Sequence, residues 1–128
     1  MTDTFYNKKQ ELKDHLLSFD VLNNTALQEY LDLIFNNIAT TKEKFKTQRH
    51  HSVPVCFYAK QNTGLKKYQL LKIANADAKN VRVNLKYSDH ILAHFLLACC
   101  TTGANKMKMV DAIKYVNVYA KDNIETKQ

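Results

Sequence analysis

The stretch from Val81 to Cys100 constrains the fold of this chain more than any other, because two different periodicities meet in it without a linker. Apolar and polar residues alternate in VRVNLKY, which is typical of a β-strand with one buried face. The next residues, DHILAHFLLACC, predict a helix that ends near Gly103, with Ser88 as candidate N-cap and Asp89 in its first turn. The chain must therefore pass directly from a strand into a helix.

Further helices are predicted on both sides of this stretch. Apolar residues share one face over residues 5–19, and a second helix is predicted from an N-cap at Thr25 to about residue 40. A last helix is predicted over residues 104–120. The segment HHSVPVCFYAK is rich in strand formers and contains the single proline, which predicts a short, irregular edge strand. The run YQLLKI is too short to assign. Together these elements predict an α+β fold.

Four of the five histidines form two close pairs in the sequence. His50 and His51 are adjacent, and neighbouring residues of a strand point to opposite faces, so they can serve two different tasks. His90 and His94 are four residues apart on a predicted helix and share one face. Such a pair can bind one metal ion, or it can be a structural or surface pair. No glutamate follows His90 as in the HExxH motif, which disfavours a metalloprotease. The fifth histidine, His15, has no evident partner.

Basic residues are concentrated between the two histidine pairs. The net charge of the chain is +7, and from Lys60 to Lys86 one acid, Asp77, accompanies seven basic residues. Such clustering favours a surface that contacts phosphates, although a solvated loop is the alternative. The basic residues are Lys60, Lys66, Lys67, Lys72, Lys79, Arg82 and Lys86.

Length and cysteine content exclude several classes of protein. The 128 residues are the usual size of one domain, and three cysteines without CxxC spacing argue against a disulfide framework or a cysteine-zinc knuckle. There is no run of 18 apolar residues and no secretory signal pattern, so we expect an intracellular, cytoplasmic protein without a membrane partner.

The two histidine segments together resemble the HNH endonuclease family, in particular its phage-type and homing-type members. HHSVPVC is similar to the family's HHxxPxC opening, and NVRVNLKYSDHILAHFLL is similar to its closing segment, an asparagine before a strand and then a helix with (D/E)HxxAHxLL. The resemblance covers about residues 48–98. It implies a small ββα-metal core over residues 48–103, flanked by an N-terminal helical region (1–47) and a C-terminal helix and tail (104–128) in one compact domain.

The resemblance also implies an activity and a role for each site residue. The chain would hydrolyse phosphodiester bonds in DNA, by nicking or double-strand cleavage, with one divalent ion such as Mg²⁺, Mn²⁺, Ni²⁺ or Zn²⁺. His51 would be the general base, and Asn80 would brace the loop behind it, with Asn84 as the rival for that position. The implied metal ligands are His50, His90 and His94.

The sequence departs from the family pattern in three places. Many relatives have a glycine pair soon after the proline, and here a long segment replaces it. The interval from Asn80 to His90 is one residue longer than usual, and no zinc-ribbon cysteines flank the motif. Two other functions therefore stay open: a non-catalytic nucleic-acid-binding protein on an HNH scaffold, and a structural-zinc interaction domain. Double-strand cleavage would indicate a homodimer, because one HNH site cuts one strand at a time.

Overall fold

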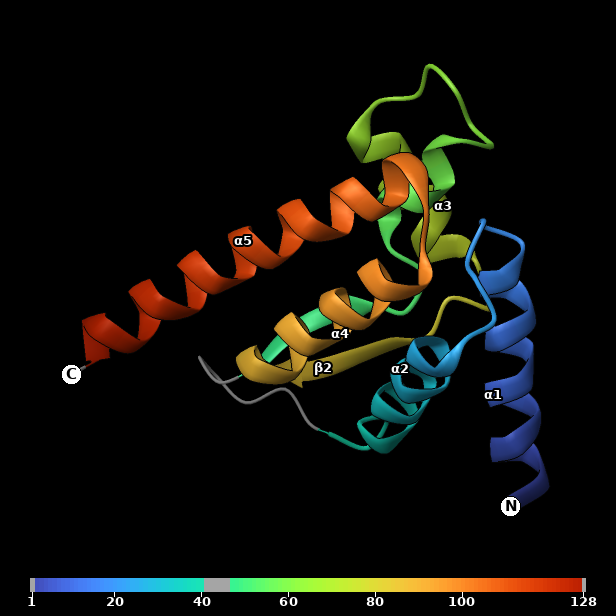
Figure 1. Cartoon of the computed structure of the whole chain (residues 1–128), viewed down its shortest axis with the longest axis horizontal. Coiled ribbons are helices and arrows are strands. Elements are labelled where there is room, and N and C mark those ends of the chain that lie inside the picture. The colour runs from blue at the N-terminus through green and yellow to red at the C-terminus, as the bar shows by residue number, and fades with distance from the viewer. Residues whose placement is uncertain (1, 41–46, 128) are drawn as a thin grey trace.

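The computed structural model describes residues 2–40 and 47–127, and in them five α-helices and one 3-10 helix accompany a two-stranded antiparallel sheet (Figure 1). This mixture confirms the predicted α+β class. The elements in chain order are α1 (Thr2–Leu17), α2 (Thr25–Asn36), β1 (Thr47–His51), η1 (Val55–Ala59), α3 (Lys67–Ala76), β2 (Arg82–Lys86), α4 (Tyr87–Cys100) and α5 (Gly103–Lys127). None of the helices in these ranges combines the length and the apolar character that a membrane span requires.

The sheet forms from the two segments that carry the resemblance to HNH proteins. In its antiparallel register, His50 pairs with Val83 and His51 pairs with Arg82. The predicted alternation in β2 is confirmed, because Val83 and Leu85 are buried while Arg82 is exposed. Helix α4 begins directly after β2, and it packs on both the sheet and α2.

A single hydrophobic core joins the helices to the sheet. One face of α2 is buried at helical spacing, through Leu27, Leu31 and Ile34, and it packs against α4. Helix α5 runs alongside α4, and its C-terminal half projects beyond the rest of the fold (Figure 1). Met109 of α5 is almost fully buried, so the first turns of α5 are part of the core.

The segment after the double histidine is not the irregular strand that its composition predicts. Strand β1 ends at His51, and residues Val55–Ala59 form a 3-10 helix, in which the N–H of Phe57 donates to the Pro54 carbonyl at 2.9 Å. Phe57 and Tyr58 are neighbours and are both buried. A strand would point them to opposite faces, whereas a helical turn brings both to the core.

Several helix ends also differ from the predictions. The N-cap of α2 is Asn24 instead of Thr25, because the Asn24 side chain accepts a hydrogen bond from the N–H of Leu27 at 3.1 Å. Helix α2 ends at Asn36, before the predicted residue 40, and Ser88 lies inside the first turn of α4 instead of capping it. The unassigned run YQLLKI belongs to α3, and the last helix continues beyond residue 120. Residues 41–46 of the predicted N-terminal region lie outside the described residues.

Candidate metal centre

Three of the predicted site residues meet in the structure at the junction of the sheet and α4. His50 comes from β1, while His90 and His94 come from one face of α4, and all three side chains are buried. The nearest ring nitrogens, one from each residue, all lie within 4.8 Å of one another. The ring centroids are 4.8–5.1 Å apart. Three imidazoles are thus close enough to bind one metal ion, as the sequence predicts.

Hydrogen bonds fix which nitrogen of His50 carries a lone pair. The hydroxyl of Tyr30 lies 2.8 Å from His50 Nε2, and it donates its own proton to the carbonyl of Ser52 at 2.6 Å. The hydroxyl must therefore accept from His50, so that Nε2 carries the proton. The lone pair of His50 is then on Nδ1, which leaves this atom as the potential metal ligand.

Hydrogen bonds also fix the tautomers of the two histidines of α4. The Nδ1 atom of His90 lies 2.8 Å from the side-chain oxygen of Gln48, and Nδ1 of His94 lies 3.3 Å from the sulfur of Met109. Both partners are acceptors, so each Nδ1 carries a proton and each Nε2 carries a lone pair. These Nε2 atoms are 3.1 Å apart. If one ring donated a hydrogen bond from Nε2 to the other ring, its own Nδ1 would carry a lone pair and would face the acceptor atom of Gln48 or Met109. A cation between the two Nε2 atoms leaves every nitrogen with a suitable partner.

The surroundings keep the three rings neutral, which is the form that binds a metal. Burial lowers the pKa of His90 to about 4, and burial together with His90 lowers the pKa of His94 to about 3. The pKa of His50 is also well below its usual value, because of burial first and then of the neighbouring histidines. The donor set therefore fits a divalent transition metal at neutral pH without competition from protons.

His51 is oriented differently from the trio, as expected for neighbouring strand residues. Its Nε2 lies 2.7 Å from the side-chain oxygen of Asn75 on α3. Since that oxygen accepts, Nε2 carries the proton and Nδ1 is free to accept one. His51 still borders the same shallow groove of about 150 Å³ as His50, His90 and His94. One groove thus presents both the candidate ligands and the candidate base.

Asn80 is buried and braces the loop that follows His51. Its amide donates to the carbonyl of Val53 at 2.9 Å and its oxygen accepts from the N–H of Val53 at 2.9 Å. The Ser52 hydroxyl also donates to it, at 3.3 Å. Asn84, the rival, is half-buried opposite Arg49 and donates to the carbonyl of Thr40 at 3.2 Å. Of the two asparagines, Asn80 is therefore the one whose side chain contacts the loop after His51.

A second layer of polar groups supports Asn80. Its amide also donates to the Tyr58 hydroxyl at 3.1 Å, and that hydroxyl donates to Asp77 at 2.7 Å. His15, which has no evident partner in the sequence, lies 2.6 Å from the same carboxylate oxygen. Burial raises the pKa of Asp77, but hydrogen bonds from Tyr58, the Lys79 N–H and His15 outweigh it, so the pKa is lowered. The Asp77 carboxylate is thus linked by hydrogen bonds, through Tyr58 and Asn80, to the loop that follows His51.

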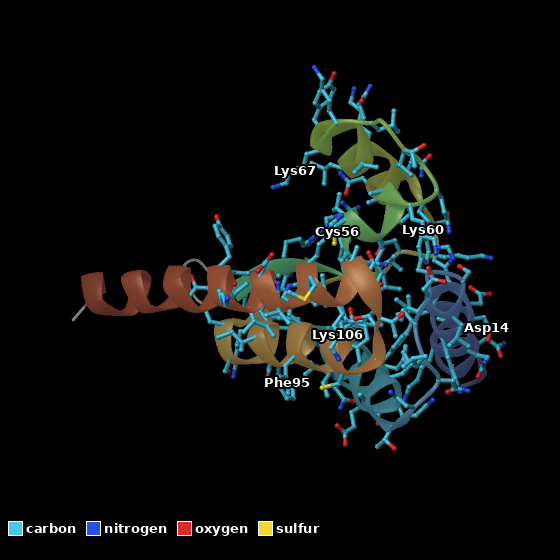
Figure 2. The ribbon with its side chains drawn as sticks, turned by 45° about the horizontal axis from the view of Figure 1, so that its top comes forward. Asp14, Cys56, Lys60, Lys67, Phe95 and Lys106 are labelled. Atoms are coloured by element: carbon cyan, nitrogen blue, oxygen red, sulfur yellow. The ribbon has the colours of Figure 1, made fainter. Side chains whose placement is uncertain are left out.

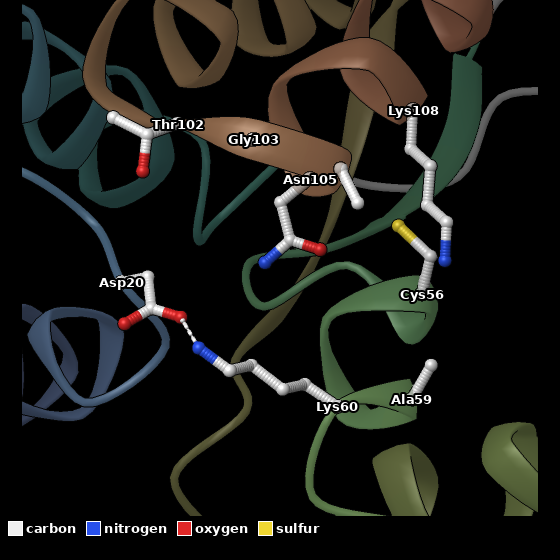
Figure 3. Close-up of a pocket in the computed structure, with 9 residues that line it drawn as sticks. Asp20, Cys56, Ala59, Lys60, Thr102, Gly103, Asn105 and Lys108 are labelled. Carbon is white, nitrogen blue, oxygen red and sulfur yellow. Dashed lines mark hydrogen bonds and ion pairs between the residues drawn. The ribbon is translucent and has the colours of Figure 1, made fainter. Parts of the chain in front are cut away.

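The predicted basic residues come from several elements of the structure. Lys60 forms an ion pair with Asp20 and borders a separate cavity of about 580 Å³ between η1 and the start of α5 (Figure 3). Lys67 points to another side of the molecule (Figure 2). The Arg82 guanidinium lies 3.5 Å from the side-chain oxygen of Asn75, the same atom that contacts His51. Lys66, Lys72, Lys79 and Lys86 are exposed.

The sequence did not reveal the groups that orient the histidines, namely Tyr30, Gln48, Asn75 and Met109. They come from α2, β1, α3 and α5, and no motif marks them in the sequence. A search of family models, curated proteins and solved structures found no match to this chain.

Proposed function

We propose that this protein is a metal-dependent endonuclease of the HNH type, with β1, β2 and α4 as a ββα-metal core. The observation that carries the proposal is that one groove contains histidines of two kinds, three that are clustered and one that is separate. Three buried imidazoles each bring one ring nitrogen to within 4.8 Å of the others, while a fourth imidazole, His51, is hydrogen-bonded to Asn75 and keeps a free acceptor nitrogen. A metal ion needs the first arrangement, and general-base catalysis needs the second.

The residues of the chain would act as follows. A divalent ion held by His50, His90 and His94 would stabilise negative charge on the scissile phosphate and the leaving oxygen. His51 would take a proton from the attacking water at Nδ1, with Asn75 holding its other nitrogen protonated. Asn80 would keep the loop after His51 in place. The groove is shallow, so a phosphate on the surface of a DNA strand can reach it.

Two observations favour this function over the alternatives. Structural zinc sites are closed by four protein ligands, whereas catalytic sites have three and an open position. In the described ranges, the trio is joined by no fourth histidine, cysteine or carboxylate, and it borders an open groove. Binding of DNA alone does not require a histidine whose tautomer is fixed by a neighbour, as Asn75 fixes that of His51.

Plasmid relaxation tests the proposal. The wild-type protein should relax supercoiled plasmid with at least one of Mg²⁺, Mn²⁺, Ni²⁺ or Zn²⁺, and a chelator should abolish this. At equal metal occupancy, His51→Ala should lower kcat by roughly 10²–10⁴, the usual contribution of a general base. Cleavage by His51→Ala at the wild-type rate would refute the assigned base, and absence of metal-dependent relaxation would refute the function.

A further inference from the structure

An apolar pocket lies beside the histidine groove and has no part in the chemistry described above. It has a volume of about 530 Å³, within the range of small-ligand sites. Its walls are Val55, Lys66, Lys67, Tyr68 and Leu71. Val55 also borders the histidine groove, so the two hollows share a wall.

One face of α3 connects the pocket to the proposed general base. Tyr68, Leu71 and Asn75 follow each other at helical spacing of three and four residues, which places them on one face. Tyr68 and Leu71 line the pocket, and Asn75 holds His51 at 2.7 Å. Seven residues of helix span about 10 Å. A strand cut at the groove would therefore have its neighbouring nucleotides within reach of the pocket.

The lining indicates the chemistry of the occupant. Tyr68 is 58% exposed and Leu71 is 41% exposed, so both present apolar surface to the same open pocket. No acidic residue lines the pocket, and Lys66 and Lys67 stand at the start of α3 beside Tyr68. An aromatic face with lysines next to it matches a nucleobase with its attached phosphate.

We infer that this pocket binds an unpaired nucleobase of the DNA strand, close to the scissile phosphate, with the base stacked on Tyr68. This inference rests on the proposed function. In an intact duplex the base is paired and stacked within the helix, and it must be extruded before it can reach Tyr68. The protein should therefore prefer single-stranded or frayed DNA to a continuous duplex.

Fluorescence of 2-aminopurine tests the inference without metal and without cleavage. The probe is a 12-nucleotide single strand with one 2-aminopurine, titrated in chelator with the full-length protein carrying His51→Ala. Stacking on Tyr68 should quench the probe, and adding Tyr68→Phe should retain the quenching. Adding Tyr68→Ala should abolish quenching and weaken single-strand binding about tenfold, while binding to the paired duplex stays the same. Tyr115→Ala, at an exposed tyrosine of α5, is the matched control and should behave as its parent.

Two results would overturn the inference. The first is equal binding of the single strand by the Tyr68→Ala protein and its parent. The second is a dimer in size-exclusion chromatography that Tyr68→Ala dissociates, since the occupant would then be a second copy of the chain. Neither result depends on cleavage. A quenched probe without plasmid relaxation would instead support the pocket and refute the nuclease, so the two proposals fail separately.

Discussion

At the scale of single residues, each candidate ligand has one ring nitrogen for the metal and a second one that a neighbouring group holds by a hydrogen bond. The partners of His50, His90 and His94 come from α2, β1 and α5 in turn. Such outer partners fix the tautomer and the ring orientation, and they commonly change metal affinity when removed. The geometry of the trio is therefore set by elements on several sides of the core.

Tyr30 gives the sharpest test of this orientation. Tyr30→Phe would leave the buried Nε2–H of His50 without an acceptor. We expect metal affinity to fall about 10- to 100-fold and the free energy of unfolding to fall by about 1–3 kcal/mol. Calorimetric metal titration and urea unfolding measure the two effects. Tyr58→Phe is the matched control, because its hydroxyl serves the Asp77 network, and it should lower stability without changing metal affinity. Equal metal affinities in both variants would contradict the account.

Asn75 is expected to be a positioning residue that acts through His51. Asn75→Ala removes the acceptor that fixes the His51 tautomer, so kcat should fall while KM and metal affinity stay near wild type. Asn75→Asp keeps an acceptor oxygen and should restore most of kcat, although its charge should raise KM for DNA. Steady-state cleavage kinetics separate the two parameters. If Asn75→Ala alters KM alone, the residue contacts DNA instead of positioning the base.

Asn80 and Asn84 can be compared by the same chemical change. Asn80 is only 7% exposed, and Asn80→Asp replaces the amide that donates to the Val53 carbonyl with a repelled oxygen. The rate of cleavage should drop sharply. This drop should exceed any decrease in the fraction of folded protein, which circular dichroism measures. Asn84→Asp lies on the polar side of the sheet and should have a smaller effect at equal metal occupancy. The opposite order would show that Asn84 holds the central position.

At the scale of secondary structure, the sequence predicted elements whose periodicity is strong. The alternation in β2 and the apolar face of α4 are both present in the structure. Helix α3 could not be assigned, because its ten residues include only a short apolar run and its exposed face carries Tyr68 and Leu71. The 3-10 helix η1 replaced a predicted strand because core packing of Phe57 and Tyr58 outweighs their strand propensity.

The contacts that complete the site could not be predicted, because they join distant parts of the chain. Tyr30 and His50 are 20 residues apart, and His51 and Asn75 are 24 residues apart. His15 and Asp77 are separated by 62 residues. The trio itself was predictable because two of its members share a helical face and the third came from the resemblance. The partners of the site residues depend on how α1, α2, α3 and α5 pack, which no local pattern records.

Helix α3 is the element for which the charge prediction can be tested. Neutralising Lys66, Lys67 and Lys72 together should weaken DNA binding and lower the slope of log K against log salt by up to about 0.9 for each lost phosphate contact. The matched control neutralises three exposed lysines of α1 and α5, Lys8, Lys106 and Lys114, and removes the same net charge. Fluorescence anisotropy at several salt concentrations gives both slopes. Equal slopes for the two triple variants would mean that α3 has no special contact with the backbone.

At the scale of the whole molecule, the buried histidines tie stability to pH. In the metal-free protein the pKa of His90 is lowered to about 4 and that of His94 to about 3, whereas an unfolded histidine titrates near 6.5. Between these values the unfolded chain binds more protons than the folded one. The free energy of unfolding should therefore fall as pH falls from about 6.5, by up to about 1.4 kcal/mol per pH unit for each histidine.

Urea unfolding of the chelator-treated protein measures this dependence. The urea midpoint should be clearly lower at pH 5 than at pH 7.5, a window in which most carboxylates stay ionised. A saturating divalent ion should raise the midpoint by similar amounts at pH 7.5 and at pH 5, because the histidines of the folded protein are still largely unprotonated at pH 5. A midpoint that is equal at both pH values would mean that the three rings are not buried as neutral groups.

The central claim is that His50, His90 and His94 bind one divalent metal ion, and calorimetric titration with Zn²⁺ and Mn²⁺ tests it most directly. We predict a stoichiometry of one ion per chain at pH 7.5, with binding lost or greatly weakened when any one of the three is replaced by alanine. His15→Ala, which changes a histidine outside the trio, should keep the stoichiometry and the affinity. Unchanged affinity in His94→Ala, or no saturable binding by the wild-type protein, would contradict the account.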